Sequence, residues 1–261
     1  MNLALAGETF AVELEAGSLA KALQIACKNF LTDAPATWTL RFRCDDRAEP
    51  LGPRQMPVMH GNRITGAGFE ATLTGRHAEI VGANERFGIE SVLKLMLAAA
   101  LLPKNRMLVH SVAVSDGTRC AVLLGERGAG KSTLGARASD AGLLRLADER
   151  VVLGDDGRVH GTPWNTGLAK DAELRLLGTL GWSDTERLEP LAPADFLPLL
   201  LSNTLLPDDS PATRSAVFSL ATRLLKTRPE RFYFSPTAAA PAFLRETLIS
   251  RANPSRPPTG G

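Results

Sequence analysis

The sequence of 261 residues has few cysteines and no strong excess of charge of either sign. Its three cysteines, Cys27, Cys44 and Cys120, are far apart and include no C-x-x-C pair. This argues against a disulfide framework or a zinc site and fits a reducing compartment. The net charge of +2 gives no electrostatic reason to expect nucleic acid or an anionic membrane as a partner.

Long apolar runs are also missing. Residues 92–102 are apolar, but this stretch is too short to span a bilayer and Lys94 interrupts it. The first eight residues lack the basic start and the apolar segment of a secretion signal. The hydrophobic share of 44% is ordinary for a globular protein, so we expect a cytoplasmic chain with one large domain or two small ones.

One segment stands out, the glycine-rich stretch 125–132 with the sequence Gly-Glu-Arg-Gly-Ala-Gly-Lys-Ser. It fits the pattern G-x-x-x-x-G-K-[ST], in which backbone N–H groups hold phosphates, the lysine reaches the outer phosphates and the serine binds Mg²⁺. The flanking residues predict a buried strand at 120–124 and a helix at 131–141, the context that an anion site requires. We therefore predict binding of ATP, or another nucleoside triphosphate, with Mg²⁺. The expected nucleotide-binding residues are Gly125, Glu126, Arg127, Gly128, Ala129, Gly130, Lys131, Ser132 and Thr133.

Two acids, Asp148 and Glu149, follow the next apolar strand, expected at 143–147. If this strand lies beside the loop strand, its carboxyl end returns to the phosphate edge of the sheet. One acid would then hold Mg²⁺ while the other accepts a proton from an incoming hydroxyl. The alternative is a capping or surface acid pair. His110, on the strand before the loop strand, would support this proton transfer, although a lone histidine there is more often a core residue.

The remaining sequence predicts three regions. Residues 1–103 form a β-rich N-terminal portion, 104–251 form an α/β nucleotide-binding core with a helical C-terminal part, and 252–261 have the composition of a disordered tail. Expected strands are 9–14, 37–43, 69–73, 77–81, 106–114, 119–124, 151–153, 158–160 and 231–234. Expected helices are 19–30, 86–102, 194–206, 211–227 and 240–251, with the pattern helical past residue 170.

The segments 108–114, 125–132 and 147–151 together resemble the catalytic core of HPr serine kinase/phosphorylases. That family has a Val-His-Gly type strand, a phosphate loop and an Ala-Asp-Asp-Arg-Val segment at similar spacings, and is related in fold to ATP-dependent phosphoenolpyruvate carboxykinase. The resemblance, which covers about residues 104–165, implies an α/β P-loop core of this type. It also implies roles for individual residues: Asp148 as the base acting on a serine hydroxyl, His110 as its helper, Lys131 as the phosphate ligand, and Ser132 and Glu149 as metal ligands.

Two departures from the family shift the expected substrate. The glycine-rich signature that supports HPr recognition has no clear counterpart, since Gly-Thr-Pro-Trp-Asn occupies 161–165, and the N-terminal region does not resemble the regulatory domain. The chain is more similar to the HPr-kinase-like proteins of peptide-modification systems, which include kinases of lasso peptide precursors. The expected activity is phosphorylation of a serine hydroxyl on a peptide or small protein. The HPr enzymes are usually hexamers, but no segment carries that property here, so a homo-oligomer stays open.

Two other functions remain as alternatives. A small-metabolite kinase would use the same core with a more enclosed pocket. A nucleotide-regulated binding or transport module is the other, although a Leu-Ser-Gly-Gly-Gln segment is missing and the acid pair follows the loop too soon for a transporter ATPase. Transfer also needs a further cation near the outer phosphate oxygens. The sequence does not choose among the four candidate arginines, each of which is otherwise a surface residue: Arg127, Arg150, Arg214 and Arg231.

Overall fold

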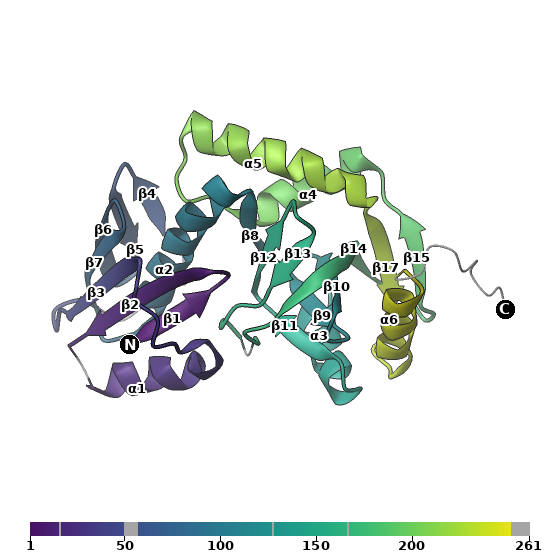
Figure 1. The fold of residues 1–261 in the computed structure, drawn as a ribbon, viewed down its shortest axis with the longest axis horizontal. Coiled ribbons are helices and arrows are strands. Elements are labelled where there is room, and N and C mark those ends of the chain that lie inside the picture. Colours follow the sequence, from purple (N-terminus) through teal and green to yellow (C-terminus); the bar gives the residue numbers. More distant parts are fainter. Residues whose placement is uncertain (16, 50–56, 127, 166, 252–261) are drawn as a thin grey trace. The chain divides into compact units, whose positions relative to one another are not determined.

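The computed structural model describes residues 1–15, 17–49, 57–126, 128–165 and 167–251, which form a mixed α/β protein (Figure 1). The chain divides into two compact units. Unit 1 contains Met1–Leu108 and Leu205–Val217, and unit 2 contains Val109–Thr204 and the residues from Phe218 onward. The α/β class is therefore confirmed. Arg127 and the expected tail lie outside the described residues.

Unit 1 is built on a seven-stranded sheet with the order β1-β2-β3-β7-β6-β5-β4. Its strands are β1 Asn2–Leu5, β2 Glu8–Leu14, β3 Trp38–Cys44, β4 Val58–His60, β5 Arg63–Gly66, β6 Phe69–Thr74 and β7 His77–Gly82. The four strands expected here are confirmed, and β1, β4 and β5 are additional. Helices α1 (Gly17–Ala26) and α2 (Arg86–Leu101) contact the sheet through β2 and through β6 and β7, respectively.

Unit 2 contains a larger mixed sheet with the order β11-β9-β10-β14-β13-β12-β8-β16, in which β17 also pairs with β14 and β15. The chain passes between the units within β8, at β16 and within α5, so the first part of α5 belongs to unit 1. The strands are β8 Arg106–His110, β9 Val112–Ser115, β10 Arg119–Leu124, β11 Leu144–Ala147, β12 Arg150–Gly154, β13 Arg158–His160, β14 Asp171–Trp182, β15 Arg187–Pro190, β16 Thr204–Leu205 and β17 Glu230–Phe234. The helices are α3 Lys131–Asp140, α4 Pro193–Asn203, α5 Pro211–Leu224 and α6 Ala239–Ser250.

Two expectations about strand pairing are corrected. The single strand expected at 106–114 is broken at Ser111 into β8 and β9. In addition, β11 does not lie beside the loop strand β10, because β9 lies between them and is antiparallel to both. Two antiparallel steps leave β11 pointing in the same direction as β10. The carboxyl ends of both strands therefore reach the same edge of the sheet, as the site requires.

The expectation that the pattern past residue 170 is helical is wrong for the first part of that region. Residues 171–182 form β14, a 12-residue strand between β10 and β17, and helices begin only with α4. The leucine-rich strand is largely buried, so its side chains show no clean alternation. Gly178 permits close pairing with β17, because a Cβ at this position would lie 1.7 Å from the carbonyl oxygen of Glu230.

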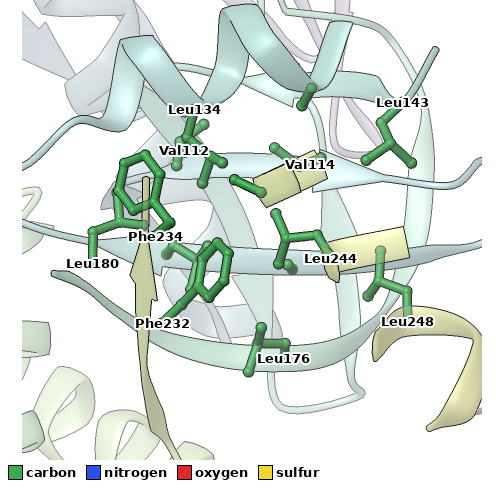
Figure 2. Packing of buried hydrophobic residues seen from close by; sticks show 14 residues of the cluster. Val112, Val114, Leu134, Leu143, Leu176, Leu180, Phe232, Phe234, Leu244 and Leu248 are labelled. Carbon is green, nitrogen blue, oxygen red and sulfur yellow. The ribbon is translucent and has the colours of Figure 1, made fainter. Parts of the chain in front are cut away.

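The core of unit 2 fixes the position of the helix that follows the glycine-rich loop. Figure 2 shows side chains of α3 (Leu134) and α6 (Leu244 and Leu248) gathered with residues of β9, β14 and β17 in one cluster. Leu134 of α3 and Leu244 of α6 are fully buried in this cluster, together with Phe232. Alternate positions along a strand face the same side, which explains why Val112 and Val114 both contribute.

Candidate functional site

Residues 125–130 of the glycine-rich stretch lie between the end of β10 and the start of α3, and Lys131 and Ser132 begin the helix, as the sequence predicts. Gly130, immediately before α3, has a φ of 95°, which favours glycine. A side chain at Gly130 is also excluded, because its Cβ would lie 2.7 Å from the ring of Phe234 and 2.9 Å from the ring of Trp182. Local conformation and neighbouring aromatic rings therefore determine the shape of the loop together.

The loop and the first turn of α3 carry the features of a phosphate site. The ammonium group of Lys131 donates to the carbonyl oxygens of Gly125 at 2.5 Å and Glu126 at 3.1 Å. Burial lowers the pKa of Lys131, while the negative charge of Asp148 opposes this shift. The first N–H groups of α3 have no partner within the helix and lie at the positive end of its dipole. This end of α3 is suited to bind an anion.

Asp148, directly after β11, is the most strongly enclosed acid of the site, with only 5% of its surface exposed. Its Oδ2 accepts hydrogen bonds from Arg145 Nη1 at 3.3 Å and Asn165 Nδ2 at 3.0 Å. Its Oδ1 is buried and accepts none from the described residues. Burial raises the pKa of Asp148, whereas the positive charges of Arg145 and Lys131 and the hydroxyl of Ser132 stabilise the carboxylate and lower the pKa. Asp148 therefore has one restrained oxygen and one that is available to a proton or a metal ion.

Arg145 and Asn165 were not identified as site residues from the sequence. Arg145 lies on β11, and a basic residue three positions before a buried acid was the only local signal. Asn165 lies in a loop that is tied to β11 by the N–H of Leu168, which donates to the carbonyl of Leu146 at 3.2 Å. The φ of Asn165 is 55°, a left-handed conformation that asparagine tolerates well.

His110 and Glu149 lie where two pairs of consecutive strands are interrupted side by side: β8 and β9, and β11 and β12. The N–H of Ser111 donates to the carbonyl of Glu149 at 3.3 Å, so the break between β8 and β9 lies beside the break between β11 and β12. His110 precedes this contact, and Asp148 precedes Glu149. The structure thus brings together the segments that carry His110, Asp148 and Glu149. Asp148 is buried, whereas His110 and Glu149 are half-buried.

The donors around Asp148 fit Mg²⁺ better than a metal that requires a full protein cage. Within the described ranges, no group of three or more His, Cys, Asp or Glu side chains could hold a metal ion. Magnesium usually needs only one or two carboxylates and binds phosphate oxygens and water as well. The Glu149 carboxylate and the exposed Ser132 hydroxyl could provide such a partial site and leave Oδ1 of Asp148 for a proton.

The candidate arginines differ in what they contact. Arg150 is buried, and its Nη1 donates to the carbonyl of Asn203 at 3.2 Å, which gives it a structural role. Arg214 belongs to unit 1, and its Nε donates to the carbonyl of Asp209. Neither contact connects these residues to the phosphate loop.

Arg231 is placed at the level of the loop by strand register. Leu124, the last residue of β10, pairs with Thr179 of β14, which in turn pairs with Arg231 of β17. All three strands are parallel, so Arg231, near the start of β17, is level with the end of β10 from which the loop departs. Its Nε donates to the Thr179 hydroxyl at 3.4 Å.

A comparison of the chain with protein-family models and with curated proteins finds no match. Within the described residues, no helix combines the length and hydropathy needed to cross a membrane.

Proposed function

We propose that this chain is a Mg²⁺- and nucleotide-dependent kinase that transfers a phosphoryl group to a serine-type hydroxyl of a peptide or small protein. The observation that carries the proposal is the buried carboxylate of Asp148, which has a free Oδ1 and interacts electrostatically with the phosphate-loop lysine, Lys131. The resemblance of the segments around His110, Lys131 and Asp148 to HPr serine kinase/phosphorylases supports the same reaction.

The free oxygen of Asp148 is suited to act as the base. The acceptor hydroxyl oxygen forms a bond to the terminal phosphorus, the bond from that phosphorus to the bridging oxygen breaks, and a nucleoside diphosphate leaves. The hydroxyl proton passes to Oδ1 of Asp148, while Arg145 and Asn165 hold Oδ2 in place. Lys131 and the first turn of α3 stabilise the phosphate charge. Bound Mg²⁺ would neutralise further phosphate charge, with Ser132 and Glu149 as its protein ligands.

The test is mass spectrometry of candidate acceptors incubated with the protein, ATP and Mg²⁺. The acceptors are a peptide encoded beside the gene, an HPr-type protein and a set of hydroxyl-bearing metabolites. We expect one added phosphate on the peptide and a loss of transfer of about 10²–10⁴-fold in Asp148→Asn. ATP binding by this variant should stay within a few-fold of the original value, because Lys131 and the loop are unchanged.

Asp155→Asn is a matched control for the same chemical change within unit 2. Asp155 pairs with Arg223 at 2.9 Å near the surface, so this variant should transfer normally. Unchanged transfer by Asp148→Asn would contradict the proposal. Phosphate on a metabolite alone would identify a small-molecule kinase, whereas ATP binding without transfer to any acceptor would favour a nucleotide-regulated binding module.

A further inference from the structure

Trp182, the last residue of β14, is unusually exposed for a tryptophan that is held by several contacts. It is 49% exposed, whereas Phe234, its pairing partner at the end of β17, is 1% exposed. The two rings are stacked with centroids 4.8 Å apart and planes inclined by 26°. Phe234 thus supports Trp182 from the core side, and about half of the tryptophan surface remains accessible.

Trp182 is also attached to the phosphate loop. Its Nε1 donates to the carbonyl oxygen of Gly128 at 3.3 Å. Its ring lies so close to Gly130 that a Cβ there would be 2.9 Å from Cζ2. The accessible ring therefore belongs to the wall of the loop, and its orientation is restrained on two sides.

The order of the strands places Trp182 and Asp148 on opposite sides of the loop strand. Asp148 follows β11, which is separated from β10 by β9, while β14 is the neighbour of β10 on the other side. Three strand spacings correspond to about 14 Å across the sheet. A nucleotide whose terminal phosphoryl group faces Asp148 would direct its other end, the nucleoside, toward β14.

From this placement we propose that Trp182 is the stacking surface for the base of a purine nucleoside triphosphate. The proposal rests on the proposed function, because it requires the phosphates to lie in the loop with the terminal group toward Asp148. A flat, restrained and half-exposed indole is suited to stack on the face of a base, and a purine offers a larger face than a pyrimidine. The hydrogen bond to Gly128 couples occupation of this surface to the conformation of the loop.

The test compares binding of ATP with binding of inorganic tripolyphosphate, which has the phosphates but no base. Calorimetric titrations would use the unmodified protein, Trp182→Ala and Trp182→Phe. We expect Trp182→Ala to weaken ATP binding about 10-fold and to leave tripolyphosphate binding within twofold, because only ATP has a base that stacks on the indole. Trp182→Phe keeps a stacking ring and loses Nε1, so it should retain most of the ATP affinity. CTP should bind more weakly than ATP to the original protein but not to Trp182→Ala.

Phe218→Ala is the control, because Phe218 is a similarly exposed aromatic residue of unit 2, at 53% exposure. It should not change either affinity. Equal loss of ATP and tripolyphosphate binding in Trp182→Ala would overturn base stacking and assign Trp182 to support of the loop. An unchanged ATP affinity would overturn it as well. If the original protein binds tripolyphosphate as tightly as ATP, only the stacking inference fails; if it binds neither, the proposed function fails too.

Discussion

Units 1 and 2 differ in how completely their buried polar side-chain atoms are hydrogen-bonded. In unit 1 the buried carboxylate of Glu8 accepts a hydrogen bond from Trp38 Nε1 at 3.3 Å and pairs with Lys104. In unit 2 several buried polar atoms have no partner. All six such side-chain atoms in the part of the chain that the structure describes belong to unit 2: Ser111 Oγ, Arg145 Nε, Asp148 Oδ1, Arg150 Nε, His160 Nε2 and Arg175 Nε.

This difference coincides with the position of the proposed site within the fold. A buried polar atom without a partner costs about 1–3 kcal/mol, so folded proteins retain few of them. Four of the six belong to Ser111, Arg145, Asp148 and Arg150, which lie at or near the two strand interruptions, at Ser111 and at Asp148–Glu149. Local rules of stability are most often violated at functional sites. The contrast between the units thus supports the same region as the motif does, by an independent physical argument.

The largest expected effect comes from removing one core ring in each unit. Phe232 of unit 2 is fully buried and stacks on Phe234 and Phe243, with centroids 5.7 and 5.6 Å away. Phe42 of unit 1 is 1% exposed. We expect Phe232→Ala and Phe42→Ala each to lower the free energy of unfolding by about 3–5 kcal/mol, because each leaves a cavity. Denaturant unfolding would measure this.

The two core variants should differ in nucleotide affinity. Phe232 supports Phe234, whose ring contacts the Gly130 position of the loop, so Phe232→Ala should also weaken ATP binding. Phe42→Ala should not, when both are measured at a temperature at which each protein is folded. Equal weakening by both variants would contradict the assignment of nucleotide binding to unit 2 alone.

The next effect compares a lysine in each unit. Lys131→Met removes the ammonium group from the phosphate loop, and we expect transfer to fall by about 10²–10³-fold, as for loss of one charged donor at a reacting group. Lys104→Met removes the partner of Glu8 in unit 1 and should leave transfer within twofold. The measurement is the initial rate of acceptor phosphorylation at saturating ATP. Loss of transfer in Lys104→Met would show that unit 1 contributes to the reaction.

Local sequence signals predicted the glycine-rich loop and most strands of the sheet that supports it, but not how these strands pair. The loop, α3 and the acid after β11 were found because glycine spacing, helical periodicity and an apolar run are encoded within short segments. The α/β class and most helices followed from the same signals. The break at Ser111 could not be found in this way, because it depends on pairing with Glu149, far along the chain.

The missed residues have the same explanation. The buried strand β14 lies between two neighbours and shows a leucine-rich run instead of alternation. Asn165 reaches Asp148 only because its loop folds back onto β11. Such a contact between two separate segments leaves no pattern in the sequence of either one. Sequence patterns thus identified the proposed reacting residues, Lys131 and Asp148, but not Arg145 and Asn165, which hold Asp148 in place.

A smaller effect should follow from changing Arg145, which pairs with Asp148 at 3.3 Å. Its positive charge lowers the pKa of Asp148 against the larger effect of burial, which raises it. Arg145→Gln should therefore raise this pKa further. Because the base must be ionised, transfer is lost as the pH falls through the pKa, and the acidic limb of the pH–rate profile should move to higher pH.

At neutral pH we expect Arg145→Gln to lower the rate by about 10-fold, as for loss of a group that orients a functional carboxylate. Arg145→Lys keeps the charge and should move the acidic limb less. A lower rate with an unchanged pH profile in Arg145→Gln would show that Arg145 acts through packing and not through the ionisation of Asp148.

The smallest effect should come from an exposed ion pair of unit 1. Glu13 and Arg41 pair at 2.9 Å on neighbouring parallel strands, with about half of each side chain exposed. Water and salt screen such a pair, so Glu13→Gln should change the free energy of unfolding by less than about 0.5 kcal/mol and leave transfer unchanged. Denaturant unfolding at low and high salt would measure it. A larger loss of unfolding free energy would mean that charge pairing matters as much in unit 1 as around Asp148. The contrast between the units would then no longer single out unit 2 as the proposed functional unit.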